Sequence, residues 1–337
     1  GFERGQTLHY VVPVFGQGAS DPINEDRFEQ LETPEVDIMF VIDNSCSMSE
    51  EQASLTANFQ SFIQFADSQA LDYQLSVIST DIDFCPIPPA ADRLPGLDQG
   101  ACGYFADGGN TGQANPAWRL ITPDEMPSPV QAFSAIATQG TNGSGNEQGL
   151  EAAYRALSSP LITGWNAGFL RANAYLALLF ISDEEDQSSN TVDFYVNYFR
   201  AIKGFRNTDL FSASAIVGDP GAGCNGAGGE ADPGSRYISV AQQTGGVFES
   251  ICTADWGQSL ENLGLSVFGY RSRFFLTNQP VAGTVRVEVD GVEIAERAPS
   301  GQIRWSYDPV SNSVNFAPLA IPEPGSEIVV RYRPDCL

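Results

Sequence analysis

A short polar loop carries three oxygen-bearing side chains at alternate positions. Asp43, Ser45 and Ser47 lie directly after the apolar run 36–42. Carboxylate and hydroxyl oxygens are hard ligands, which suit Mg²⁺, Ca²⁺ or Mn²⁺ better than zinc or copper. The alternative interpretation is that the serines only cap a following helix. The loop therefore predicts either a divalent-cation site or a simple helix start.

Further carboxylates follow two other apolar runs. Asp183 comes directly after the run 174–182, and two aspartates follow the run 73–80. The carboxyl ends of parallel strands meet at one edge of a sheet, where ligands bind, so we expect these groups near Asp43. Five further acidic residues either bind a second ion, with Ca²⁺ expected, or neutralise the first ion so that no acidic partner is attracted, or form a solvated acidic rim: Asp81, Asp83, Glu184, Glu185 and Asp186.

Short apolar runs alternate with segments of helical period from residue 36 onward. This pattern predicts an α/β fold, with a doubly wound, mostly parallel sheet covered by helices on both faces. The expected strands are 36–42, 73–80, 174–182, 210–217 and an edge strand at 247–252. The expected helices are 50–67, 130–138, 147–157, 191–203, 236–244 and 255–270.

The hydrophobic period changes from 3.6 to 2 near residue 270. Alternating valines at 285–289, an Asp290-Gly291 turn and a returning run predict a β-hairpin. Further alternation up to residue 332 predicts a small antiparallel, sandwich-like β-domain. We expect domains at 36–268 and 269–337, preceded by an extension, 1–35, whose strand-like segment 7–15 packs on the β-domain.

The polar loop and its context resemble the von Willebrand factor A family over roughly residues 36–268. The metal-ion-dependent adhesion site of that family uses D-x-S-x-S after the first strand and an aspartate after the fourth. These positions match Asp43, Ser45, Ser47 and Asp183. The resemblance implies a bound Mg²⁺, Ca²⁺ or Mn²⁺, with an open position that an acidic side chain of a partner protein completes.

The family also supplies a threonine before the third helix. Counting back from Gly149 places Ser144 at that position, which we favour because a serine hydroxyl also donates an oxygen; Thr141 is the alternative. Cys46 is a further departure, since the family commonly has glycine there.

Six cysteines occur without a CxxC motif or a Cys/His cluster, which favours disulfides and an oxidising compartment. We expect bridges between Cys85 and Cys102 and between Cys224 and Cys252, the first contributing about 3 kcal/mol. Cys46 has three interpretations: it is a reactive thiol, it forms a disulfide with Cys336 or another cysteine, or it is simply a half-buried small residue.

The excess of acidic residues limits the classes of partner that the protein can bind. With 42 acidic and 17 basic residues, the net charge of −25 opposes binding to nucleic acid or anionic lipid. No apolar run is long enough to insert into a membrane, and no leader precedes the domain, so we expect any export signal to lie outside this sequence. The Gly-rich run 218–229 is interpreted as a flexible loop, because it lacks phosphate-loop spacing.

A single histidine, His9, argues against His-dependent hydrolases, and we expect no enzymatic activity. The whole arrangement looks like exported A-domain proteins of Gram-negative bacteria that carry a C-terminal β-domain. We therefore expect a secreted or cell-surface module that binds a protein ligand through a metal ion. The alternative is a structural subunit of a bacterial surface filament or envelope assembly, capable of self-assembly, in which the ion is structural or absent.

Overall fold

The computed structural model describes residues 23–30, 35–68, 71–83, 101–113, 115–172, 174–204, 210–267, 272–309, 311–317 and 320–335. The chain divides into two compact units, one within residues 34–269 and one that joins an N-terminal strand to the segment after residue 270. No described helix is both long and apolar enough to cross a membrane. The strand-like segment 7–15 lies outside the described residues.

The larger unit is built on a five-stranded parallel sheet in the order β3-β2-β4-β5-β8. Its central strands are mostly apolar and are buried along nearly their whole length, as is typical of parallel strands covered on both faces. The predicted α/β class with a mostly parallel sheet is confirmed. The strands are β2 (Glu35–Ile42), β3 (Asp72–Ser79), β4 (Tyr175–Ser182), β5 (Phe211–Val217) and β8 (Phe248–Ser250).

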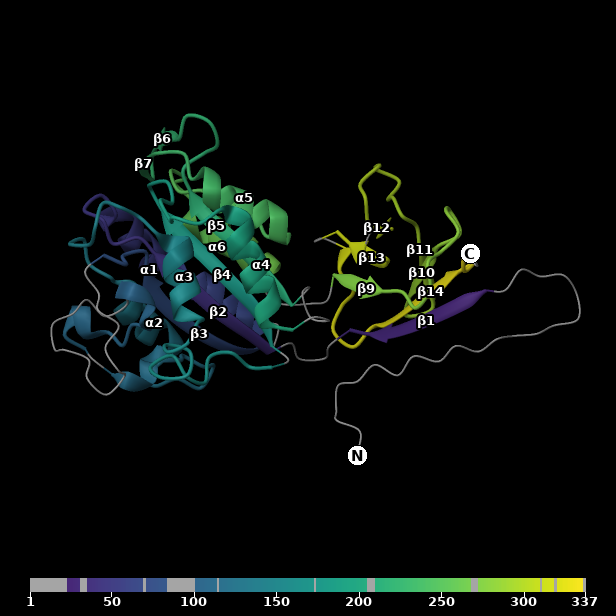
Figure 1. Ribbon diagram of the computed structural model, residues 1–337, viewed down its shortest axis with the longest axis horizontal. Helices are drawn as coiled ribbons and strands as arrows, with labels where there is room; N and C mark the ends of the chain where they lie inside the picture. The colour runs from purple at the N-terminus through teal and green to yellow at the C-terminus, as the bar shows by residue number, and fades with distance from the viewer. Residues whose placement is uncertain are drawn as a thin grey trace, which may run out of the picture. The chain divides into compact units, whose positions relative to one another are not determined.

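Helices cover both faces of this sheet (Figure 1). A hydrophobic core lies on each face of the sheet, and alternate residues of β2 point into one or the other. Phe40 packs against Phe59 and Phe62 of α1, whereas Met39 and Val41 belong to the core on the opposite face. One face carries α1 (Ser49–Ser68), α2 (Pro129–Ala137) and α6 (Trp256–Val267); the other carries α3 (Gly149–Ala156), α4 (Val192–Ile202) and α5 (Ser235–Thr244).

Local sequence sets the helix ends. The Ser128 hydroxyl accepts the amide of Gln131 at the start of α2, and Thr191 accepts the amide of Phe194 at the start of α4. Gly245 ends α5 in the left-handed conformation, with φ of 79°. These caps fix where the chain leaves each helix and returns to the sheet.

The Gly-rich run 218–229 was interpreted as a loop, but it includes one short strand and the start of another. β6 (Cys224–Gly226) and β7 (Gly229–Ala231) pair as a short antiparallel hairpin. Short 3₁₀ turns occupy Ala101–Gly103 (η2), Gly109–Thr111 (η3) and Pro116–Arg119 (η4).

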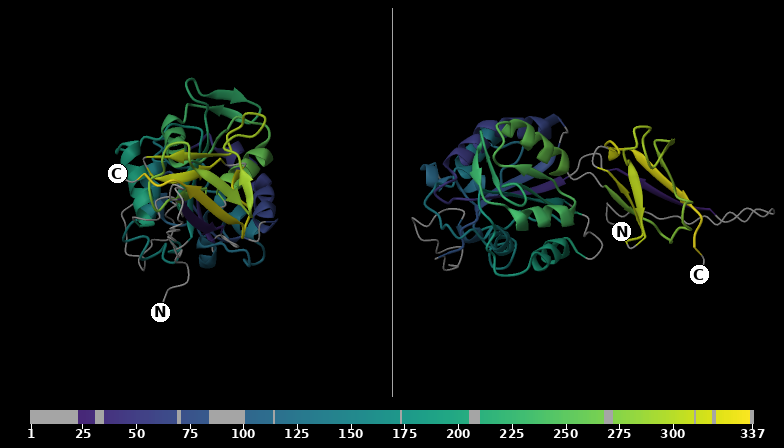
Figure 2. Two further views of the ribbon diagram at one scale, coloured as in Figure 1. Left: turned by 90° about the vertical axis from the view of Figure 1, so that its right-hand side faces the viewer. Right: turned by 90° about the horizontal axis from the view of Figure 1, so that it is seen from above.

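The second unit consists of two small antiparallel sheets, in the orders β1-β14-β10-β11 and β12-β13-β9. The predicted hairpin is present, with Asp290 and Gly291 at φ of 52° and 77° in its turn. The N-terminal strand β1 lies along β14 (Figure 2). The strands are β1 (Asn24–Glu29), β9 (Arg273–Phe275), β10 (Arg286–Val289), β11 (Val292–Ile294), β12 (Trp305–Asp308), β13 (Ser313–Phe316) and β14 (Glu327–Tyr332).

Candidate metal centre

The loops after β2 and β4 meet at the carboxyl edge of the parallel sheet. These strands are neighbours in register, and the amide of Asp43 donates to the carbonyl of Ile181 at 2.9 Å. Asp43 and Asp183, each the first residue after its strand, are therefore brought to the same edge. The sheet topology alone explains this meeting of residues that are far apart in sequence.

Asp43 is held in one orientation by its neighbours. Its Oδ1 accepts the amide of Ser45 at 2.7 Å, and its Oδ2 accepts the hydroxyl of Ser182 at 2.6 Å. The Ser45 and Ser47 hydroxyls are 3.1 Å apart. The side-chain amide of Gln52 in α1 donates to the backbone carbonyl of Asp43 at 2.8 Å, which ties the helix to the loop. Asp43 and Ser45 are buried, while Ser47 is exposed.

Asp183 is the second buried carboxylate at this edge. Its side chain is 5% exposed, and its Oδ1 has no hydrogen-bond partner. Burial, with the negative charge of Asp183, raises the pKa of Asp43 to about 6, and burial also raises the pKa of Asp183. Two carboxylates held out of water and near each other are stabilised by a positive charge between them.

The two hydroxyls considered for the threonine position have different surroundings. The Ser144 hydroxyl donates to Asp83 Oδ2 at 2.8 Å. Thr141 follows Gly140, whose carbonyl accepts a second hydrogen bond from Gln52, at 2.9 Å. Both hydroxyls belong to the loop that crosses the site, and both remain candidate ligands.

Glu147 and Glu51 are buried acidic residues that the sequence patterns did not single out as part of the site. Glu147 accepts the hydroxyl of Thr80 on one oxygen and has no partner on the other, and burial next to Asp43 raises its pKa to about 9. Burial raises the pKa of Glu51 to about 7, with the charge of Asp183 contributing. Glu51 could have been found, because it lies four residues before Leu55 on the buried face of α1.

The acidic residues after β3 form a local turn. Asp81 Oδ1 accepts the amide of Asp83 at 2.9 Å, and the carbonyl of Asp81 accepts the amide of Cys102 at 2.6 Å. Both aspartates are partly exposed, and burial raises the pKa of Asp81. They lie beside Ser144, on the β3 side of the edge.

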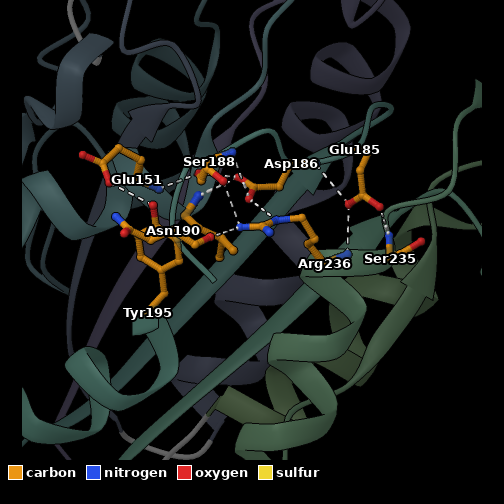
Figure 3. A network of polar contacts seen from close by, with 9 residues as sticks. Glu151, Glu185, Asp186, Ser188, Asn190, Tyr195, Ser235 and Arg236 are labelled. Atoms are coloured by element: carbon orange, nitrogen blue, oxygen red, sulfur yellow. Dashed lines mark hydrogen bonds and ion pairs between the residues drawn. The ribbon is translucent and has the colours of Figure 1, made fainter. Parts of the chain in front are cut away.

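The acidic run after β4 has structural partners (Figure 3). Glu185 accepts the amides of Ser235 and Arg236 at the start of α5, at 3.0 and 2.9 Å. Asp186 is buried. Its carboxylate accepts hydrogen bonds from the Arg236 guanidinium at 2.8 Å and from the backbone amide of Leu150 at 3.1 Å. Asp186 is therefore not on a solvated rim: it joins the starts of α3 and α5. Glu184 stays partly exposed beside Asp183.

The cysteines divide into bridged and free. The predicted Cys224–Cys252 disulfide is present and links β6 to the segment after β8. Cys102 is disulfide-bonded, and Cys85 and Cys336 lie outside the described residues. Cys46 is free and exposed, so it is neither bridged nor half-buried.

The donor set at Asp43, Ser45, Ser47 and Asp183 fits a hard cation. It offers two carboxylates and two hydroxyls, one of the carboxylate oxygens being buried without a partner. Within the described ranges, no three Asp, Glu, His or Cys side chains gather as an ion-binding group. Hydroxyl and water oxygens would complete such a shell.

The chain matches no protein-family model and no curated protein. Among solved structures, proximal thread matrix protein 1 from the mussel byssus is 10% identical in one crystal form and 14% in another, with TM-scores of 0.40 and 0.36. These alignments cover 74% and 72% of this chain and 51% and 48% of the mussel chains. The pilus adhesin SpaC from Lactobacillus rhamnosus GG is 12% identical, with a TM-score of 0.42, over 94% of this chain and 41% of its own. This chain thus spans about half the length of these proteins or less.

Proposed function

We propose that the chain is an extracellular von Willebrand factor A-type module that binds a protein ligand through a divalent cation. The observation that carries this proposal is the pair of buried carboxylates, Asp43 and Asp183, at the carboxyl edge of the sheet. None of the ion pairs in the described part of the chain includes either of them. A charge that the chain does not itself supply would stabilise them.

Each residue of the site has a role in this proposal. Asp43 and Asp183 hold the ion, while Ser45 and Ser47 add neutral oxygens. Bound Mg²⁺, Ca²⁺ or Mn²⁺ would neutralise the two carboxylates and offer a position for an oxygen of the partner. The hydroxyl of Ser182 orients Asp43 by its 2.6 Å hydrogen bond. A third hydroxyl comes from the crossing loop, through Ser144 or Thr141.

The fold supports the family assignment. The five-stranded parallel sheet has helices on both faces, and the D-x-S-x-S loop follows β2, an internal strand that lies between β3 and β4. The aspartate after β4 stands beside that loop, as the family pattern requires. The family assignment remains a proposal that rests on this arrangement.

Composition and the disulfide support an extracellular binding role. The Cys224–Cys252 bridge favours an oxidising compartment, and the net charge of −25 opposes nucleic acid. We propose binding and no catalysis, because the sequence has a single histidine and no phosphate-binding loop. By the same proposal, the module acts on the outer side of a bacterial envelope.

A metal-dependent capture experiment tests this function. The protein is immobilised and exposed to a surface extract of the cells that make it, with Mg²⁺ or with chelator. We expect a protein that is retained with Mg²⁺, released by chelator and not retained by the Asp43→Ala variant. Asp193→Asn, which removes an exposed carboxylate on α4, is the control and should retain it. Retention that is unchanged by chelator and by the Asp43→Ala substitution would contradict the proposal.

A further inference from the structure

A groove of about 410 Å³ opens directly beside the candidate ion site. Ser47, Asp183 and Glu184 line it from the loops after β2 and β4. The β6–β7 hairpin and its exit also line it, with Glu230 and Asp232. The groove and the ion site therefore share two residues, so a partner that reaches the ion also meets the groove.

The hairpin wall of the groove is firmly attached. The Cys224–Cys252 disulfide fixes its first strand, and the amide of Asp232 donates to the carbonyl of Asp183 at 2.8 Å. The segment after the hairpin also lies close to Gly218, where a Cβ would lie 1.9 Å from the carbonyl oxygen of Asp232. The groove is thus a built feature of the fold, held by covalent and backbone contacts.

All the charged side chains that line the groove are acidic. Asp183, Glu184, Glu230 and Asp232 are carboxylates, and none of the described residues that line the groove is Lys, Arg or His. Glu230 and Asp232 are exposed, and Glu184 is partly exposed. A divalent ion would balance Asp43 and Asp183 only, so the other three carboxylates would stay uncompensated.

A second observation points to a ligand here. Asp183 is 5% exposed, lines the groove, and keeps Oδ1 without a hydrogen-bond partner. An acidic side chain entering beside it would meet Glu184, Glu230 and Asp232, and like charges in an interface strongly disfavour a partner. A cationic side chain would instead be attracted by these carboxylates and could form charge-assisted hydrogen bonds with them.

We propose that this groove binds an arginine side chain of the partner protein, beside the ion. The inference rests on the proposed function, because it describes the partner of the same site. The planar guanidinium has several donors that can engage neighbouring carboxylates together, which a lysine ammonium cannot match geometrically. The acidic groove therefore selects for a basic residue next to the group that reaches the ion.

Three capped tripeptides provide the probe: acetyl-Gly-Xaa-Gly-amide, with arginine, its neutral isostere citrulline, or glutamate in the middle. Binding is followed by NMR amide shifts at 0.15 M salt with Mg²⁺. We expect the arginine peptide to shift residues 183–184 and 222–232 and to bind about tenfold more tightly than the citrulline peptide, as the loss of a charge-assisted bond implies. The glutamate peptide should not bind.

A pair of charge-matched double variants separates the groove from general attraction to an acidic protein. Glu230→Gln with Asp232→Asn should abolish the preference for arginine over citrulline. Asp193→Asn with Glu261→Gln removes two exposed carboxylates on α4 and α6 and should leave the preference intact. Equal binding of arginine and citrulline, equal loss in both double variants, or shifts confined to other residues would overturn the proposal.

The same titrations with chelator separate this proposal from the proposed function. A preference for arginine that survives in chelator, and in Asp43→Ala, would support the groove even in a protein that binds no ion. Normal ion binding without any arginine preference would overturn the groove alone and leave the metal centre standing.

Discussion

The amide of Gly143 donates to the carbonyl of Asn44 at 2.8 Å, and this hydrogen bond joins the crossing loop to the D-x-S-x-S loop. The approach is so close that a Cβ on Gly143 would lie 2.3 Å from the Oδ1 of Asn44. Asn44 is itself buried beside Asp43. The geometry of the site therefore depends on a glycine in a different segment of the chain.

Gly143→Ala tests this dependence. The added methyl group should push the two loops apart, cost about 1–3 kcal/mol of stability and weaken Mg²⁺ binding about tenfold or more. Gly145→Ala is the matched control, because nothing lies within 4 Å of its Cβ position. Calorimetric titration and urea unfolding of both variants give the comparison. Equal effects at the two positions would contradict a specific role for the Gly143 contact.

Glu147 makes the metal-free protein sensitive to pH. Its pKa is about 9 in the folded protein and 4.5 in the unfolded reference. Between these values the folded protein keeps a proton that the unfolded chain has released, so the free energy of unfolding falls as pH rises from about 4.5 to 9.

Glu147→Gln should remove this loss, because glutamine resembles the protonated acid. We expect the variant to be more stable than the parent at pH 8 in chelator and close to it at pH 5, as measured by urea unfolding. Glu261→Gln, on the exposed face of α6, should change neither value. A variant that is less stable than the parent at both pH values would refute this explanation.

Arg236 compensates the buried carboxylate of Asp186, at 2.8 Å. Arg236→Gln should cost about 3 kcal/mol of stability, because it leaves a buried charge without its partner. Arg155→Gln breaks a more exposed pair with Glu151 on α3 and should cost less than about 1 kcal/mol. Urea unfolding midpoints of the two variants test the difference. Similar costs would show that the Asp186 pair is no more important than the partly exposed Arg155–Glu151 pair.

The Cys224–Cys252 disulfide closes a loop with a sequence separation of 28. Replacing both cysteines by serine should lower the free energy of unfolding by about 3–4 kcal/mol in the chain-entropy model. Cys46→Ser, which alters an exposed free thiol, should change it by less than about 0.5 kcal/mol. Chemical unfolding under non-reducing conditions measures both. A double variant as stable as the parent would mean that the hairpin wall is held without the bridge.

Apolar patterning was sufficient to predict the α/β core. The run 36–42 was predicted as a strand and is β2, and 50–67 was predicted as a helix and is α1. Long buried runs and helical periods are local signals, which tertiary contacts seldom reverse. The meeting of Asp43 with Asp183 followed from the same reasoning, because both end parallel strands.

The strand β1 escaped prediction because its sequence is polar. Four of its residues are Glu25, Asp26, Arg27 and Glu29, yet Asp26 is buried and accepts the Tyr332 hydroxyl at 2.8 Å. Its pairing with β14 depends on a contact across 306 residues, which no local pattern reports. The partners of Asp186 and Glu147 were missed for the same reason.

The metal centre is tested by calorimetric titration of Mg²⁺, Ca²⁺ and Mn²⁺ into chelator-stripped protein, beside Asp43→Ala and Asp183→Ala. We expect saturable binding of at least one ion to the parent and loss of that binding in both variants, each of which circular dichroism should show to be folded. Absence of binding to the parent, or binding that both variants retain, would contradict the metal centre.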